Sequence, residues 1–368
     1  MVSKSSPKRR PRKRSNKLAA MFLTKILHPI LLGVSAFAIV TATAQDPAVR
    51  LGGEIPAEVD AIYERGLAYL SRTQGEDGTW RSRSEHGITG ICLMAFLASG
   101  EDPNYGAHRH HIKAGLRAII EGQERDTGFI PNSMYHHGFA MLALAEAYGT
   151  VDEATLWKGN EADDVRQSIA TTLEKAIALA VTAQKANRWG GWRYSPTSTD
   201  ADTSVTGSVL MGLLACRNAG LAVPEATIED AIKYMQRNTA SSGFVAYSGG
   251  IGGGGESMAR SAVATLVYAV GHRRDTEEFK NALVHISERL DHRETAHTHY
   301  FYYYMAQALF QGNFEAWDRW NRAHASMLSE QQAPDGSFPG SYGEAYGTAM
   351  SLLSLALNYR FLPIYERF

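Results

Sequence analysis

The sequence predicts an all-α protein in which about six helix pairs close into a ring around one hub. The chain has 368 residues, 44% hydrophobic and 20% charged, which suits a large core and excludes a disordered chain, a collagen-like fibre and a multi-span membrane protein. One helix–turn–helix unit recurs along most of its length. The units at both ends lack polar caps, which favours a closed ring over the alternative, an open superhelix.

The first 44 residues form a basic leader. They hold nine Lys and Arg residues and no acid, then an apolar run over 30–40, then Ala42-Thr43-Ala44. This order of a basic segment, an apolar run and small residues is typical of a secretory signal peptide. The apolar run is shorter than the ~20 residues that a membrane span requires. We therefore expect an exported protein, periplasmic or secreted. A nuclear-type basic cluster and an uncleaved anchor are the alternatives.

Cleavage after Ala44 would change the charge of the protein. All 38 acidic residues follow this point but only 28 of the 37 basic ones, so the remainder carries a formal charge of −10. An acidic chain is poorly suited to nucleic acid, so we expect no such partner, and no membrane-spanning segment remains without the leader. The two cysteines cannot supply a disulfide framework or a four-thiolate zinc site.

After a short linker over 45–56, the repeat makes a single domain of residues 57–368. Each unit has an amphipathic helix ending near a Gln, a turn with a Gly and an aromatic residue, and a second helix rich in Ala, Leu and Met. The last interval between turn aromatics is about two units long, which predicts a further unit without this turn over 283–310. The turn aromatics are Trp80, Phe129, Trp192, Phe244 and Phe338, and they lie 49, 63, 52 and 94 residues apart.

The second helix of each unit is the more apolar one, so we expect these helices to form the inner ring. One pair cannot bury both of its apolar faces alone, whereas stacked pairs share a core. We expect the Gln and the aromatic residue of each turn to tie an outer helix to the next inner helix. The predicted inner helices cover 87–97, 138–147, 206–216, 259–270, 300–309 and 347–357.

The first unit carries a more specific motif. From Arg65 to Trp80 the chain reads basic-Gly-x-x-Tyr-Leu-x-x-x-Gln-x-x-x-Gly-x-Trp. This run resembles the QW repeat of squalene–hopene and oxidosqualene cyclases, and residues 332–338 repeat its latter half with Phe in place of Trp. Over residues 57–360 the chain thus resembles the terpenoid cyclase and protein prenyltransferase superfamily, including its prenyltransferase and squalene oxidase repeat proteins. The resemblance implies an (α/α)6 toroid.

Polar and aromatic residues gather just before and within the predicted inner helices. Because the units share one phase, we expect these side chains to meet at one mouth of the ring. Acids, imidazoles and phenols together are typical of acid–base catalysis or of sugar binding. We take His137 as a catalytic candidate, and the candidate ligand-binding residues are His86, Tyr135, His136, Glu256, Arg260, His299, Tyr300, Tyr303, Glu344 and Tyr346.

The segment from Asp200 to Ser204 reads Asp-Ala-Asp-Thr-Ser and resembles a shortened squalene–hopene cyclase acid motif, Asp-any-Asp-Asp-Thr-Ala. In that family the middle Asp protonates an alkene, which requires a carboxyl group held in its protonated form. The resemblance implies this role for Asp202, with Asp200 as its partner, although Thr203 stands where the family has a third Asp. The alternative is that Asp202 or Ser204 caps the following helix.

Other motifs give weaker signals. His297 and His299 with the histidines at 136–137 could bind a metal, or could equally hydrogen-bond hub tyrosines, and we predict neither metal nor cofactor. Cys92 and Cys216 lie in apolar helical segments as core residues, unlike the cysteine of a prenyltransferase zinc site. The glycine-rich segment 249–255 lacks the Lys of a phosphate loop and is either a lid or a linker.

Three functions are compatible with these observations. The first is a cyclase-like or prenyltransferase-like enzyme with Asp202 as acid and hub aromatics that stabilise cations, although squalene cyclases have two helical domains and this chain has one. The second is an exported glycan lyase or hydrolase that uses hub acids and tyrosines. The third is a binding toroid without catalysis. In each case the expected partner is a small molecule, lipid or glycan in the hub.

Overall fold

Outer and inner helices alternate along the chain. The computed structural model describes residues 55–81, 85–158, 166–250 and 257–366, all within one compact unit from Pro47 to Phe368. The outer helices are α2 (Ala57–Thr73), α4 (Arg109–Gly122), α7 (Ile169–Lys185), α9 (Glu225–Arg237), α11 (Glu277–Ser287) and α13 (Phe314–Gln331). The inner helices are α3 (His86–Ala98), α5 (Met134–Ala147), α8 (Thr203–Asn218), α10 (Met258–Val270), α12 (Thr298–Gly312) and α14 (Glu344–Leu355). Short elements are α6 (Glu153–Leu156) and the 3-10 turns η1 (Ala356–Asn358) and η2 (Pro363–Tyr365).

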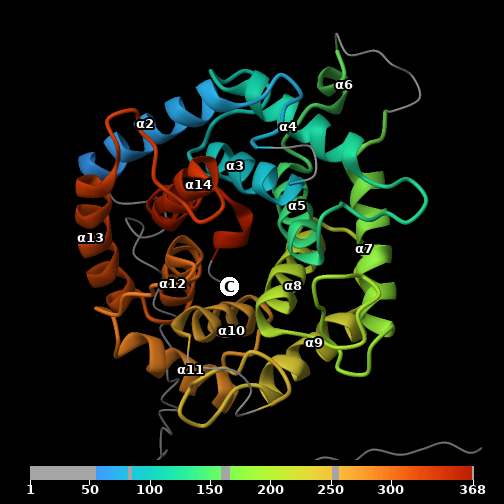
Figure 1. Cartoon of the computed structure of the whole chain (residues 1–368), viewed down its shortest axis with the longest axis vertical. Coiled ribbons are helices and arrows are strands. Elements are labelled where there is room, and N and C mark those ends of the chain that lie inside the picture. The colour runs from blue at the N-terminus through green and yellow to red at the C-terminus, as the bar shows by residue number, and fades with distance from the viewer. Residues whose placement is uncertain (1–54, 82–84, 159–165, 251–256, 367–368) are drawn as a thin grey trace, which may run out of the picture. The chain divides into compact units, whose positions relative to one another are not determined.

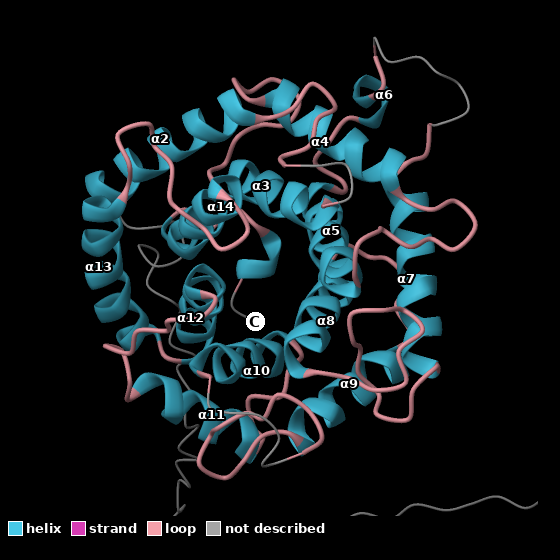
Figure 2. Ribbon diagram, in the orientation of Figure 1, coloured by secondary structure: helices cyan, strands magenta, loops and turns pink. Residues whose placement is uncertain are grey.

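The six pairs form a closed ring, as predicted. Figure 1 shows the inner helices around the hub and the outer helices around them. The last pair meets the first, because α14 packs against α3, and both α13 and α14 pack against α2. In the described part of the chain, Figure 2 draws helices and loops without a strand, and the sole trace of β structure is an isolated bridge between Thr239 and Val245.

Burial distinguishes the two rings. Every residue of α3 from His86 to Ala98 is buried, whereas outer helix α9 buries only one stripe, which includes Ile228, Ala231 and Met235. A helix that is apolar all round needs neighbours on every side, and the inner ring provides them. Small residues bring these helices close together: a Cβ added to Gly90 would lie 2.9 Å from the carbonyl oxygen of Phe139. The sequence of the second helices therefore dictates their inner position.

The turn glutamines link neighbouring outer helices. Gln74 Nε2 donates a hydrogen bond to the Gly78 carbonyl of its own turn (2.9 Å) and another to the His111 carbonyl of α4 (2.9 Å). Gln123 and Gln184 bond α7 and α9 in the same way. The predicted link to the next inner helix is therefore wrong for Gln, because the side chain leaves the end of one outer helix beside the next one. Gln332 closes the ring by donating to the Ile62 carbonyl of α2 (3.0 Å).

Each of these turns needs its glycine. Gly336 has φ +91°, and a Cβ there would lie 2.2 Å from the Arg65 carbonyl oxygen of the next outer helix. The buried anchor of each turn comes two residues after the glycine, as Phe338 does. In the second and fourth units this anchor is Ile130 or Val245, so Phe129 and Phe244 lie one position before it and are only half-buried.

The C-terminal segment fills the end of the ring where the inner helices finish, which we call the far end. Figure 1 shows this red segment inside the inner ring. Ile364 and Tyr365 are buried there, and the Ile364 amide donates to Glu146 Oε2 at the end of α5 (3.3 Å). Burial raises the pKa of Glu146 to about 8. The far end is thus closed by the chain itself.

Some predictions concern residues outside the described ranges. These are the leader over 1–44, most of the linker over 45–56, the candidate Glu256 and most of the glycine-rich segment. Among the described helices, none combines the length and the apolar character that a membrane crossing demands.

Candidate functional site

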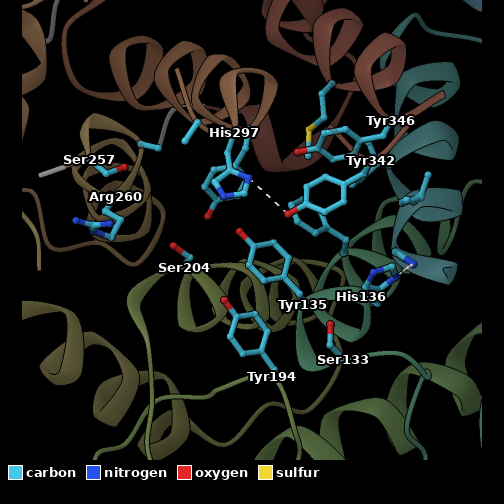
Figure 3. Close-up of a pocket in the computed structure, with 18 of the residues that line it drawn as sticks. Ser133, Tyr135, His136, Tyr194, Ser204, Ser257, Arg260, His297, Tyr342 and Tyr346 are labelled. Carbon is cyan, nitrogen blue, oxygen red and sulfur yellow. Dashed lines mark hydrogen bonds between the residues drawn. The ribbon is translucent and has the colours of Figure 1, made fainter. Parts of the chain in front are cut away.

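A cavity of about 540 Å³ lies where the inner helices begin, and we call it the hub cavity (Figure 3). Each of the six inner helices supplies at least one lining residue from its first two turns: Ile88, Tyr135, Ser204, Arg260, Tyr300 and Tyr346 are examples. Ile91 and Met350 lie about five residues into their helices, so the cavity reaches roughly 8 Å into the ring.

The cavity has an apolar floor and a mouth rich in phenols. Ile91, Phe139 and Met350 contribute to the floor. Tyr135 packs against Phe139 and Tyr300, with ring centroids 5.7 and 5.8 Å apart. The other lining tyrosines are Tyr194, Tyr247, Tyr342 and Tyr346. Such a cavity can bind a ligand that has both hydroxyl groups and a hydrophobic face.

His136 lines the cavity and uses one ring nitrogen as an acceptor. Its Nδ1 accepts a hydrogen bond from the Gly87 amide (3.2 Å), and burial lowers its pKa. The imidazole is therefore neutral at neutral pH, and the proton lies on Nε2 because Nδ1 is the acceptor.

His297 and Tyr342 form another part of the mouth. The two rings are stacked with centroids 6.1 Å apart and 7° between their planes, and the Tyr342 hydroxyl lies 3.5 Å from His297 Nδ1, as the dashed line in Figure 3 shows. His297 has a left-handed backbone, with φ 57° and ψ 41°, immediately before α12. This backbone conformation turns the residue at the entrance to the helix, where it lines the cavity.

Two arginines lie against the ring of the lining residue Tyr247, and of these Arg260 lines the cavity whereas Arg193 does not. The Tyr247 ring has the guanidinium carbon of Arg193 5.5 Å and that of Arg260 5.9 Å from its centroid, and its hydroxyl lies 3.2 Å from that of Tyr194. Arg260 Nε donates to the Val245 carbonyl (3.0 Å). Burial lowers the pKa of Arg260 while the Glu294 carboxylate acts in the opposite direction, and a guanidinium remains charged at neutral pH.

Glu294 is the single carboxylate among the described lining residues. Its side chain is 14% exposed, and Oε2 accepts a hydrogen bond from Ser257 Oγ (3.4 Å). One carboxylate at this position can hold a hydroxyl or balance the Arg260 charge.

Asp202 is a helix cap. Its side chain is buried, Oδ1 accepts from the Val205 amide at the start of α8 (2.9 Å), and Oδ2 has no hydrogen-bond partner within the described structure. Burial raises its pKa to about 6. Asp202 is not among the cavity-lining residues, and Asp200 is ion-paired at the surface with Arg193 (2.8 Å). The capping interpretation thus describes the Asp202 contacts.

Three predicted histidines lie between the inner and outer rings. His137 accepts from the Ile130 amide at Nδ1 and lies 3.1 Å from the Ala176 carbonyl of α7 at Nε2. His86 is 3% exposed and packs against Gly122 of α4. His299 contacts Tyr302 edge-on. Successive helical residues point in different directions, so His136 faces the cavity whereas His137 faces the outer ring.

The remaining predicted residues also divide into those that line the hub cavity and those that do not. Tyr135, His136, Arg260, Tyr300 and Tyr346 line the hub cavity together.

Two others do not line it. Tyr303 lies deeper, with its ring 6.0 Å from that of Phe139. Glu344 accepts a hydrogen bond from the Tyr69 hydroxyl of α2 (2.9 Å).

The residues predicted from the sequence do not include Tyr194, Tyr247 and Glu294, which line the cavity. Tyr194 and Tyr247 each follow the buried anchor of their turn, Trp192 or Val245, by two residues, so a search at that offset finds both. Glu294 belongs to the unit without the turn and has no such signal.

Among the described residues, possible metal ligands do not gather at one point. No group of three or more His, Cys, Asp or Glu side chains within 55–81, 85–158, 166–250 and 257–366 is arranged to hold an ion. His297 lines the cavity while His299 does not, so the His-x-His pair does not converge.

Comparisons with known proteins identify the fold. No protein-family model and no curated protein sequence matches the chain. Among solved structures, the GH76A α-1,6-mannanase of Salegentibacter sp. HEL1_6 is similar, with a TM-score of 0.56 and 9% identity over 82% of this chain and 99% of that one. A type II terpene cyclase, MstE from Scytonema, solved with geranylgeranyl dihydroxybenzoate, has a TM-score of 0.53 and 14% identity over 83% and 99%.

A third similar structure is a possible GH105 family member from Salmonella enterica serovar Paratyphi A, with a TM-score of 0.52 and 13% identity over 83% of this chain and 94% of that chain. At these identities the likeness shows the fold alone, an (α/α)6 toroid that the mannanase and the terpene cyclase share.

Proposed function

We propose that the protein is an exported carbohydrate-active enzyme that binds an acidic glycan in the hub cavity and cleaves it by β-elimination. The observation that carries the proposal is the pairing of Arg260 with phenols and imidazoles around a cavity whose described lining has one carboxylate, Glu294. Glycoside hydrolysis usually needs two carboxyl groups, one on each side of the scissile bond. Elimination needs a base, an acid and a cation instead.

The electrostatics of the cavity favour an anionic ligand. The N-terminal ends of all six inner helices lie at the mouth, and each carries the positive end of a helix dipole. Arg260 adds a positive charge beside Tyr247, and the Glu294 carboxylate offsets part of it. A sugar carboxylate placed here gains from both, and the tyrosine rings offer faces on which a sugar ring can pack.

The reaction requires three groups. Arg260 binds the carboxylate and stabilises the negative charge that develops on it. His297 takes the proton from the carbon next to the carboxylate, and the electron pair forms a carbon–carbon double bond as the bond from the adjacent carbon to the glycosidic oxygen breaks. Tyr194 gives its proton to that oxygen. Partial burial and the Tyr247 hydrogen bond raise the pKa of Tyr194, so its hydroxyl keeps a proton for this step.

The solved mannanase supports a glycan and sharpens the choice of reaction. That enzyme was captured with α-1,6-mannotriose as an inactive variant in which two neighbouring aspartates are replaced by asparagine. The described lining of this cavity has no pair of neighbouring aspartates. The shared fold therefore supports glycan binding, and the different lining favours elimination over hydrolysis.

Ultraviolet absorbance of the unsaturated product tests the proposal. The chain from Gln45 on is incubated with polygalacturonate and other acidic glycans, and with uncharged dextran as the matched control. We expect absorbance to rise with an acidic glycan only, and Arg260→Gln to abolish most of the rise. Cleavage without an unsaturated product would show hydrolysis instead and would contradict the proposal.

A second candidate rests on Asp202. Its buried Oδ2, which has no partner among the described residues, and its pKa of about 6 suit a carboxylic acid that donates a proton to an alkene, although Asp202 does not line the hub cavity. A similar structure is a type II terpene cyclase. Incubation with squalene and with geranylgeranylated phenols tests it. Turnover that disappears in Asp202→Asn would support this candidate, and turnover that survives in Asp202→Asn would eliminate it.

A further inference from the structure

A second cleft lies on the outside of the ring, beside α4 and α6. Its volume is about 660 Å³, and we call it the outer cleft. Its described lining holds four permanent cations and one carboxylate, Asp152, which is occupied in capping α6 through the Ala154 amide (3.0 Å). The cations are Arg109, Lys113, Arg117 and Lys158, and His110 and His111 lie among them.

Among the described residues, ion pairs do not balance the positive charge of the outer cleft. None of its four cations has a carboxylate within ion-pair distance in the described structure. Lys113 donates to Thr155 Oγ1 (2.6 Å) and Arg117 to the Leu156 carbonyl (2.8 Å), so these two hold α6 in place with neutral acceptors. Glu121 acts electrostatically on Arg117, but four cations against one lining carboxylate leave an excess of positive charge among the described residues of the cleft, which attracts anions.

The cations have a regular spacing. Arg109, Lys113 and Arg117 lie four residues apart on α4, so they share one face at intervals of about 6 Å along roughly 12 Å of helix. Tyr105, at the same cleft, is 83% exposed, the highest exposure among the large hydrophobic side chains described. A row of cations beside an exposed aromatic ring suits a polymer of sugar rings with repeated negative charges.

We propose that the outer cleft is a second binding site for an anionic polysaccharide, separate from the hub cavity. The choice of polymer rests on the proposed function, in which the hub cleaves an acidic glycan. The cleft would hold a distant part of the same kind of chain and thereby raise its concentration near the hub mouth. Arg109 and Lys158 would contact the anionic groups and Tyr105 a sugar ring.

Titration with dextran sulfate tests the proposal, with uncharged dextran as its control. Dextran sulfate has no carboxylate, so the proposed hub reaction cannot cleave it, and the titration requires no turnover. The titration uses the chain from Gln45 on, and circular dichroism verifies that each variant folds. We expect Arg109→Ser/Lys158→Ser to weaken binding about fivefold or more, with a smaller dependence on salt concentration, and Tyr105→Ala to weaken it about twofold.

The matched control, Lys185→Ser/Lys233→Ser, removes the same charge from exposed positions on α7 and α9. We expect it to bind dextran sulfate as the unmodified chain does. Equal loss in the two double variants would mean general charge attraction and would overturn the proposal, as would unchanged binding in the cleft variant. A chain that binds dextran sulfate at the cleft but cleaves no glycan would refute the hub reaction alone.

Discussion

The two ends of the inner ring differ in the exposure of their polar side chains. At the hub mouth, Tyr194 and Tyr342 are 49% and 43% exposed, and Arg260 keeps its charge beside a cavity. At the far end, Glu146 is 5% exposed and Tyr365 3% exposed, and the carboxyl group of Glu146 meets the Ile364 amide. The mouth can therefore exchange its contacts for those of a ligand, whereas the far end is part of the core.

The direction of the helices explains this difference. All six inner helices begin at the mouth and finish at the far end. Helix N-termini favour anions, whereas C-termini disfavour a carboxylate and thus act in the same direction as the burial that raises the pKa of Glu146 to about 8. Substitutions at the far end should change the free energy of unfolding, and those at the mouth should change ligand binding or turnover.

The largest effect is expected at Tyr365. Tyr365→Ala removes a buried aromatic ring from the far end, so we expect the free energy of unfolding to fall by about 3–5 kcal/mol in urea denaturation. Tyr365→Phe is the matched control. It removes only a buried hydroxyl that has no partner in the described structure, so stability should stay equal or rise. A similar loss in both variants would contradict the packing explanation.

At the mouth, Arg260→Gln should lower kcat/KM for an acidic glycan about a hundredfold, because it removes the cation that stabilises the developing charge. Arg260→Lys keeps a charge and should recover part of the activity. Urea denaturation should show a smaller stability change than for Tyr365→Ala. If Arg260→Gln unfolds the protein while Arg260→Lys retains full activity, Arg260 stabilises the fold, and the expected difference between the hub mouth and the far end does not hold for this residue.

Glu146 predicts a pH dependence of stability. Its pKa in the folded chain is about 8, raised from 4.5 by burial, so the folded state binds more protons than the unfolded state between these values. Its contribution is therefore fully present below about pH 4.5 and is lost as pH rises toward 8, with a slope of at most about 1.4 kcal/mol per unit. Glu146→Gln should lose less stability between about pH 5.5 and about pH 7.5. Equal losses in both proteins would show that Glu146 is not the titrating group.

Asp202 gives the smallest expected effect. Asp202→Ala removes the cap of α8 and should cost about 1 kcal/mol of unfolding free energy, whereas Asp202→Asn keeps an acceptor for the Val205 amide and should cost a few tenths. Thermal unfolding of the two variants measures the difference. Equal destabilisation by both would mean that the charge, and not the cap, matters at this position.

The periodic part of the sequence was enough to predict the ring. The alternation of amphipathic and apolar helices repeats six times. The unit without a turn glycine, predicted over 283–310, consists of α11 and α12 and begins six residues earlier, at Glu277. The reason is that repeated burial of the same face leaves a repeated pattern.

The site was harder to predict, because the direction of a side chain depends on one residue of helical phase. His136 and His137 are neighbours in sequence, yet one lines the cavity and the other bonds to backbone groups of other elements. Asp202 carried a motif signal for chemistry, but its contacts are those of a cap. Glu294 has no counterpart in other units, so no repeat could indicate it.

The bond from Gln332 to the Ile62 carbonyl joins residues 270 positions apart. During synthesis α2 is made long before α13 and Gln332, so the bond between Gln332 and Ile62 is the last of the glutamine links that can form. Until then one side of α2 is exposed, and α13 and α14 must pack against it. Joining the ends and cutting the chain at a surface loop would move this late step elsewhere in the ring, so the order of assembly belongs to the connectivity rather than to the finished structure.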